Sequence, residues 1–269
     1  RRVLFRSQYK FPSNPKLPPY NFQVILLTAN RGQGKTVLVC NLLNLEKEYI
    51  DYLYIISPNS KTDPKVLESV KGFDYQIFDD LSEELVETIE KEIDHKIDLY
   101  QQSVKLMKLI KGLNKKKHLN DDELELLESI NENELDLMMK LYKRGRPPTT
   151  TLCIDDMAGT NLLHKDNGPL VKLIIKNRHR YLVPIICVQN LKSISPAIRR
   201  VSSWLLISNT LDEEYRKQLY GIVQGAVQNY EKFQEIMEEL NKEKYSFLSI
   251  YSNGHNSDIR LNLNKKIHL

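Results

Sequence analysis

The sequence predicts an α/β fold in which a mostly parallel central sheet is covered by helices on both faces. Three observations lead to this fold class. Short apolar runs alternate with helical segments, several of these runs end in polar or acidic residues, and the first run leads into a glycine-rich turn. Continuous apolar strands are typical of parallel sheets, because helices bury both faces of such a sheet. The 269 residues and the hydrophobic fraction of 41% suffice for one large domain with an insertion.

The first predicted strand, residues 24–27, continues into a glycine-rich loop and then a helix. The loop reads Ala29, Asn30, Arg31, Gly32, Gln33, Gly34, Lys35 and Thr36. Its two glycines tolerate backbone angles that turn successive N–H groups inward around a phosphate, and the helix start adds unpaired N–H groups. In such a P-loop Lys35 reaches the β- and γ-phosphates, and the Thr36 hydroxyl ligates Mg²⁺. Ala29 stands where the first glycine is usual. We therefore predict that these residues bind ATP with Mg²⁺, rather than forming an ordinary strand-to-helix connection.

Two further strands are predicted at 52–56 and 75–78, and a helical insertion follows at 82–143. Within the insertion, apolar residues recur at steps of three and four, as they do on one face of a helix, until Gly112. A capping box that begins at Asn120 predicts a second helix. We expect a helical hairpin whose apolar stripe packs within the protein. The alternative is that the stripe forms a coiled-coil contact with a partner.

The strand predicted at 150–154 delivers two carboxylates, Asp155 and Asp156, to the sheet edge where open α/β sheets bind ligands. In a P-loop enzyme the first acid holds Mg²⁺ through water, as in a Walker B strand. The second acid, Asp156, is then placed to orient or deprotonate the attacking water. The alternative is an acidic turn in which Asp156 caps the next helix.

A buried strand at 184–188 ends in Gln189, whose amide can both donate and accept hydrogen bonds. We expect Gln189 to sense the γ-phosphate or to hold the water. A strand at 204–207 and helices at 170–177 and from 212 onward continue the alternation of strands and helices.

The two ends of the sequence differ from this alternating pattern. Residues 1–21 are rich in proline and are expected to form an extended arm. Near the other end, strands at 246–251 and 259–263, joined by a turn at 253–254, predict a terminal β-hairpin. The expected organisation is therefore the arm followed by one P-loop ATPase domain, residues 22–269, that carries the helical insertion.

Two arginine-containing clusters flank the later strands, one at Arg178 and the other at Arg199 and Arg200. Each cluster can be read as a charge-rich turn. The sharper interpretation is an arginine that reaches the nucleotide of a neighbouring subunit, because a rigid guanidinium stabilises the charge of phosphoryl transfer.

Composition gives only weak information about the partners and the location of the protein. The formal net charge of +4 gives weak support for a nucleic-acid partner. The three cysteines, Cys40, Cys153 and Cys187, lie in apolar contexts without metal-ligand spacing, and their odd number suits a reducing compartment. No apolar run is long enough to span a membrane, and no signal peptide is evident. We expect a soluble intracellular protein.

Taken together, the motifs resemble those of the FtsK/HerA superfamily of DNA-pumping ATPases. The likeness is greatest to the viral branch, the poxvirus-type genome-packaging ATPases of large DNA viruses and virophages. The motifs are the P-loop, the strand ending in two aspartates, the Asn-Arg-His sequence at 177–179 before a strand ending in Val-Gln, and the segment 198–209. The resemblance covers residues 24–251, whereas the insertion matches weakly and the proline-rich arm does not match.

The resemblance implies a RecA/FtsK-like P-loop NTPase fold and assigns roles to individual residues. It implies that Lys35 and Thr36 are Walker A residues, that Asp155 is the Walker B acid and that Gln189 is the sensor. Many members have glutamate where this chain has Asp156. Asp156 is the proposed general base, and its shorter side chain departs from the pattern of the superfamily. Of the three arginines, Arg178 best matches the arginine-finger position, which acts in trans, and Arg199 and Arg200 are the competitors.

The function implied by the resemblance is ATP-driven translocation of double-stranded DNA, independent of its sequence, into a preformed viral capsid. Its implied partners are capsid or portal-vertex proteins and further copies of the chain in a pentameric or hexameric ring. The implied location is the host cytoplasm or virus factory, or the virion itself. Two alternatives stay open: a cellular HerA-like DNA translocase or helicase, and a nucleotide-gated scaffold with little hydrolysis.

Overall fold

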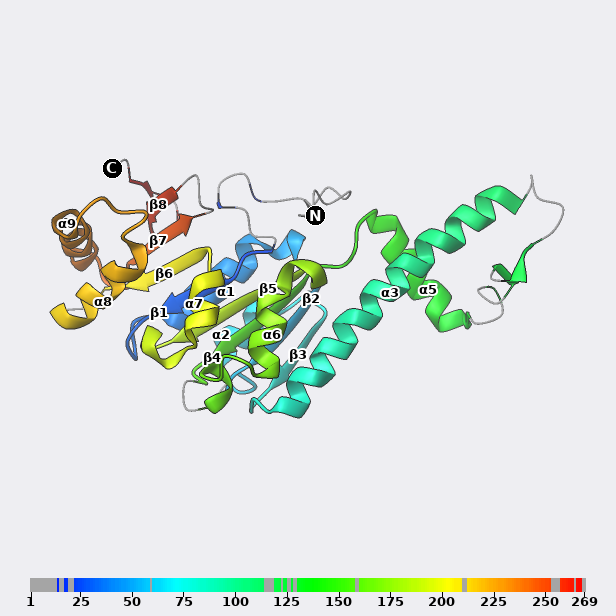
Figure 1. Ribbon diagram of the computed structural model, residues 1–269, viewed down its shortest axis with the longest axis horizontal. Coiled ribbons are helices and arrows are strands. Elements are labelled where there is room, and N and C mark those ends of the chain that lie inside the picture. The colour runs from blue at the N-terminus through cyan, green and yellow to red at the C-terminus, as the bar shows by residue number, and fades with distance from the viewer. Residues whose placement is uncertain are drawn as a thin grey trace. The chain divides into compact units, whose positions relative to one another are not determined.

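The computed structural model describes residues 14, 17, 18, 22–58, 60–113, 119–121, 123, 124, 127, 130–157, 160–209, 212–252, 257–263 and 265–267 (Figure 1). Contacts divide the chain into two units. The sheet unit comprises residues 13–87 and 149–269, and the helical unit comprises residues 1–12 and 88–148. The predicted arm lies mostly outside the described residues, as does the turn predicted at 253–254.

The described strands of the sheet unit form one nine-stranded sheet in the order β3-β2-β4-β5-β1-β6-β7-β8-β9. All pairs among β1 to β6 are parallel. The pairs β6–β7, β7–β8 and β8–β9 are antiparallel. Their bounds are β1 (Ile25–Thr28), β2 (Tyr52–Ile56), β3 (Tyr75–Phe78), β4 (Thr150–Asp155), β5 (Leu182–Val188), β6 (Trp204–Ser208), β7 (Phe247–Ser252), β8 (Ser257–Leu261) and β9 (Lys265–Lys266). The expected mostly parallel sheet is confirmed, and the predicted terminal hairpin of β7 and β8 extends that sheet rather than standing apart.

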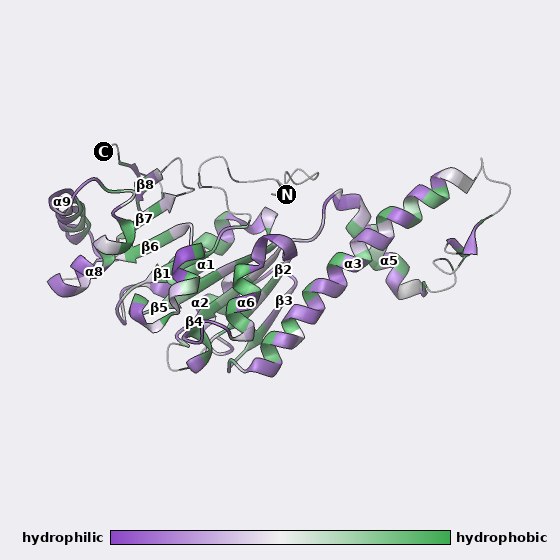
Figure 2. Ribbon diagram, in the orientation of Figure 1, coloured by the Kyte–Doolittle hydropathy of each residue, from purple (hydrophilic) through white to green (hydrophobic). Residues whose placement is uncertain are grey.

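Helices cover both faces of this sheet, as predicted. Side chains of β1 that point to one face, Ile25 and Leu27, share an apolar core with α1 and α2. Leu26, between them, points to the opposite face and lines a cavity there with residues of α7 and α8. In Figure 2 the central strands are predominantly hydrophobic, which agrees with burial of both faces.

The sequence predicted some helices of the sheet unit and missed others. Their bounds are α1 (Lys35–Leu45), α2 (Pro64–Ser69), α6 (Pro169–Ile175), α7 (Pro196–Val201), α8 (Glu213–Val223) and α9 (Tyr230–Asn241), with short 3₁₀ turns η1 (Lys47–Tyr49), η2 (Asn161–Leu163), η3 (Asn177–Arg180) and η4 (Leu191–Ser193). The predicted helix at the end of the P-loop begins at Lys35. Sequence periodicity missed α2 and α7, because each has six residues, too few to show a helical repeat.

The helical unit is built on α3 (Glu83–Leu113) and α5 (Glu132–Arg144), which pack through a small core. That core consists of Leu99, Tyr100, Leu106, Met138 and Leu141. Figure 2 shows hydrophilic and hydrophobic bands alternating along α3, as expected for a helix buried along one stripe. The helix ends one residue beyond Gly112.

The second helix of the predicted hairpin is interrupted. The capping box of Asn120 and Glu123 is present, with reciprocal hydrogen bonds of 2.9 and 3.1 Å. However, Ile130 and Asn131 are not helical, and α5 starts with its own capping box between Asn131 and Glu134. A second asparagine cap therefore divides the segment that the sequence predicted as one helix.

Within the described part of the chain, no helix combines the length and the apolar character that crossing a membrane requires.

Candidate active site

The glycine-rich loop after β1 has the backbone conformation of a phosphate cradle. Gly32 and Gly34 have φ angles of 78° and 83°, in the left-handed region that glycine occupies without strain. The Lys35 ammonium donates to the carbonyl oxygens of Ala29 and Asn30, at 2.8 and 3.3 Å, so it lies inside the turn. Since α1 begins at Lys35, the N–H groups of its first turn face the same space.

Neighbouring strands hold this loop in place. The Gln33 side-chain oxygen accepts from the Asn30 N–H at 3.2 Å and from the Ser208 hydroxyl at 2.5 Å. Ser208 is the last residue of β6, so the carboxyl end of that strand supports the loop from the side. Arg31 is exposed and lines the same cavity as the glycines.

Thr36 and Asp155 meet where β4 ends beside α1. The Thr36 hydroxyl donates to Asp155 Oδ2 at 3.3 Å. The other carboxylate oxygen, Oδ1, is buried and has no hydrogen-bond partner among the described residues. Burial is the main reason that the pKa of Asp155 is raised, and the ammonium of Lys35 opposes this. A hydroxyl beside a buried carboxylate oxygen that lacks a partner is a donor set that fits Mg²⁺, an ion that prefers oxygen ligands.

Asp156 and Gln189 also lie together, at the ends of adjacent strands. Because Asp155 is paired with Cys187 in the register of β4 and β5, the residues after both strands reach the same edge. The Gln189 amide nitrogen donates to Asp156 Oδ1 at 3.2 Å. The backbone of Asp156 has φ 55°, an uncommon value for a residue other than glycine, and such outliers cluster at functional sites.

A tyrosine from α8 supports this edge of the sheet. The Tyr215 hydroxyl lies 2.5 Å from the Thr28 hydroxyl and accepts from the Leu191 N–H at 3.3 Å. Thr28 in turn donates to the carbonyl oxygen of Gln189 at 3.4 Å. These bonds link the end of β1 to the turn after β5 and thereby fix where Gln189 projects.

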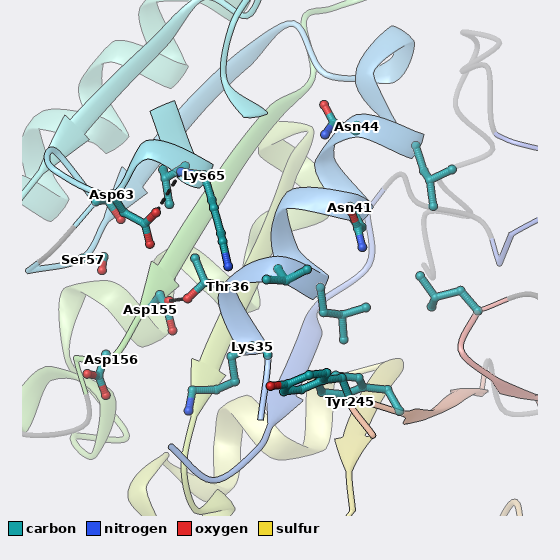
Figure 3. A pocket seen from close by; sticks show the side chains of 18 of the residues that line it. Lys35, Thr36, Asn41, Asn44, Ser57, Asp63, Lys65, Asp155, Asp156 and Tyr245 are labelled. Atoms are coloured by element: carbon teal, nitrogen blue, oxygen red, sulfur yellow. Dashed lines mark hydrogen bonds between the residues drawn. The ribbon is translucent and has the colours of Figure 1, made fainter. Parts of the chain in front are cut away.

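One cavity of about 1440 Å³ is lined by both glycines of the loop and by Lys35, Thr36, Asp155, Asp156 and Gln189. Figure 3 shows Lys35, Thr36, Asp155 and Asp156 on one side of it and Tyr245 below α1. Residues after β2 also contribute side chains, among them Ser57, Asp63 and Lys65. The cavity exceeds the volume of about 300–1,000 Å³ that is usual for small-molecule sites. There is therefore room for more than the phosphates of a nucleotide.

The three arginines considered as arginine fingers do not line the cavity at the P-loop. Arg178 is in η3, which Asn177 anchors at the amino ends of β1 and β5 by donating to the carbonyl oxygens of Phe22 and Leu182, at 2.9 and 3.2 Å. Arg178 precedes β5 and Gln189 follows it, so the length of this strand separates the two residues by about 20 Å at the usual rise per residue.

Arg199 and Arg200 belong to α7, directly before β6, and they line a separate cavity of about 630 Å³. None of the three arginines lines the cavity at the P-loop.

Several residues of this site gave no signal in the sequence. Ser208 and Tyr215 support the P-loop and Gln189 through side-chain hydrogen bonds that join strands and helices far apart in the sequence. Lys65 and Tyr245 reach the cavity from α2 and from the turn before β7. No local motif marks such residues, because only the order of strands in the sheet brings them to the P-loop.

No protein-family profile and no curated protein matches the chain. Among solved structures, it is similar to the DNA-packaging ATPase B204 of Sulfolobus turreted icosahedral virus, with 16% identity over 93% of this chain and 100% of that chain and a TM-score of 0.48. It is also similar to the pCW3 conjugation coupling protein TcpA, with 17% identity over 88% of this chain and 59% of that chain and a TM-score of 0.45. A third similar structure holds ATPases 2 and 3 of EssC from Geobacillus thermodenitrificans, with 12% identity over 81% of this chain and 45% of that chain and a TM-score of 0.46.

Proposed function

We propose that the chain is a Mg²⁺-dependent ATPase and that it uses hydrolysis to move double-stranded DNA. The observation that carries the ATPase is the meeting of four groups at one sheet edge. The phosphate-binding turn and its Lys35 lie beside the Thr36–Asp155 contact and the Asp156–Gln189 pair. A protein that only binds a nucleotide as a switch does not need the last pair.

Each group has a distinct task in this proposal. The P-loop N–H groups and Lys35 bind and orient the β- and γ-phosphates. Thr36 and Asp155 would hold Mg²⁺, which when bound neutralises charge on the phosphate oxygens. Asp156 accepts a proton from the attacking water, and the Gln189 amide orients both this carboxylate and the water. The hydrogen bond between these two side chains supports the pairing of a base with a residue that positions it.

The DNA-moving part of the proposal is supported by the sequence motifs rather than by this geometry. Their order resembles that of DNA-pumping ATPases, and the finer proposal is packaging of a viral genome into a preformed capsid by a ring of subunits. In such a ring Arg178, at the amino ends of the strands, would act on the nucleotide of a neighbouring subunit. Capsid or portal-vertex proteins would be its partners, at the virus factory or in the virion.

ATP hydrolysis and nucleotide binding, measured side by side on variants, test the ATPase. Lys35→Ala should weaken binding and abolish hydrolysis. Asp156→Asn should bind ATP with Mg²⁺ nearly as wild type does, yet hydrolyse it about 100- to 10,000-fold more slowly, the usual contribution of a general base. Turnover at the wild-type rate in Lys35→Ala would overturn the P-loop assignment. Loss of binding rather than turnover in Asp156→Asn would instead exchange the roles of the two acids.

A further inference from the structure

The cavity at the P-loop continues past the phosphate-binding turn along α1, where apolar side chains and asparagine amides line it together. Three large apolar side chains that line it remain exposed: Val37 by 40%, Leu45 by 49% and Tyr245 by 58%. Single exposed apolar side chains are common, but several that gather in one cavity with a few polar groups are typical of a ligand site.

The face of α1 in this region is arranged as a continuous stripe. Val37, Asn41 and Leu45 follow one another at steps of four residues, so they lie on one face of the helix. All three are exposed and line the cavity. Figure 3 shows the Asn41 and Asn44 side chains on α1, farther along the helix than Thr36. Residues 262 and 263, after β8, line the cavity as well.

Tyr245 lines the same cavity as this stripe and lies against the phosphate-binding turn. Its ring carbon Cδ1 is 3.4 Å from the position that a Cβ atom on Gly34 would take, so the ring rests against the P-loop. The Lys244 ammonium lies over the ring, 5.1 Å from its centre. The backbone of Tyr245 has φ 65°, a strained conformation for a residue with a large side chain. The turn before β7 thus holds an aromatic ring in the cavity beside the P-loop.

We infer that this part of the cavity is a nucleobase subsite, in which the Tyr245 ring stacks on adenine and the Asn41 amide pairs with the edge of the base. The inference rests on the proposed ATPase. An asparagine amide presents a donor and an acceptor side by side, which matches the N7 acceptor and N6 donor of adenine. Guanine presents two acceptors at the same edge, which an amide cannot satisfy together. The subsite therefore favours ATP over GTP.

Binding of three probes to the full chain tests this inference: ATP, GTP and inorganic tripolyphosphate, each with Mg²⁺ and measured by calorimetry. Tyr245→Ala should weaken ATP binding on the order of tenfold, the usual effect of removing a stacking ring, and leave tripolyphosphate binding unchanged. Tyr245→Phe should bind ATP as wild type does. Asn41→Ala should reduce the preference for ATP over GTP without changing tripolyphosphate binding.

Tyr75→Ala is the matched control, because Tyr75 is 42% exposed on β3 and does not line the cavity. It should change none of the affinities. The inference is overturned if Tyr245→Ala leaves ATP binding unchanged, or if it weakens ATP and tripolyphosphate binding equally, which would mean that the ring only supports the P-loop. If wild type binds neither ATP nor tripolyphosphate, or if Lys35→Ala binds both as wild type does, the proposed ATPase fails as well.

Discussion

Glu46, a buried acid at the end of α1, should make the free energy of unfolding depend on pH, and this effect is independent of catalysis. Glu46 has no exposed surface, and neither of its carboxylate oxygens has a hydrogen-bond partner among the described residues. Burial raises its pKa from 4.5 to about 8. The protonated form is therefore favoured in the folded state, whereas the unfolded chain ionises at its ordinary pKa.

The direction of the effect follows from this difference. Below the pKa of the unfolded chain, both states hold the proton and Glu46 imposes no ionisation penalty. As the pH rises from 4.5 to about 8, the unfolded state loses its proton first, so the free energy of unfolding falls. At about 1.4 kcal/mol per pH unit, the full loss is about 5 kcal/mol. This is an upper limit, because water entering around the charged carboxylate recovers part of it.

Glu46→Gln removes the ionisable group while keeping the shape of the side chain. Between about pH 5 and pH 8.5, the stability of the variant relative to wild type should rise by up to about 4 kcal/mol. Urea unfolding at a series of pH values measures this, with the fluorescence of Trp204, the single tryptophan and a fully buried residue, as the probe. The matched control is Glu48→Gln, two residues away and exposed, which should show no such trend. A difference between Glu46→Gln and wild type that stays constant with pH would refute the reasoning.

Two further predictions concern assembly and DNA. If Arg178 acts across a subunit interface, Lys35→Ala and Arg178→Ala should each be inactive alone, and mixing them should restore part of the ATP hydrolysis, because each variant keeps what the other lacks. Full activity of Arg178→Ala alone would move the finger to Arg199 or Arg200. Affinity for duplex DNA should fall linearly with salt concentration on logarithmic axes, irrespective of sequence, because phosphate contacts release counterions. If the protein prefers one short DNA sequence and keeps this preference at high salt, that result would contradict a motor that moves any DNA.

Local sequence patterns predicted the strands and the P-loop well, because these are set by neighbouring residues. Strands β2 and β3 have the predicted bounds, since a polar residue stands directly before and directly after each. The turn around Gly32 and Gly34 has the left-handed angles that its composition requires. Asp156 and Gln189 were each predicted at the end of a strand, and the structure brings them together because parallel strands end at one edge of the sheet.

What the sequence did not reveal depends on long-range packing or on competition between local signals. Asn131 repeats the capping pattern of Asn120, and nothing in the pattern alone tells whether one helix or two will form. Ser208 and Tyr245 reach the P-loop because β6 pairs with β1 and β7 pairs with β6 in the sheet, an order that no local motif encodes. The burial of Glu46 is equally invisible in a helix whose other residues predict an ordinary polar end.

The central claim, that ATP hydrolysis at the P-loop moves duplex DNA, is tested most directly by displacement of a third strand from a DNA triplex. The account predicts that the wild-type protein hydrolyses ATP faster when duplex DNA is present and displaces the third strand only with ATP and Mg²⁺. Lys35→Ala and Asp156→Asn should displace none. Hydrolysis that proceeds at one rate with or without DNA, together with no displacement at any protein concentration, would contradict the claim.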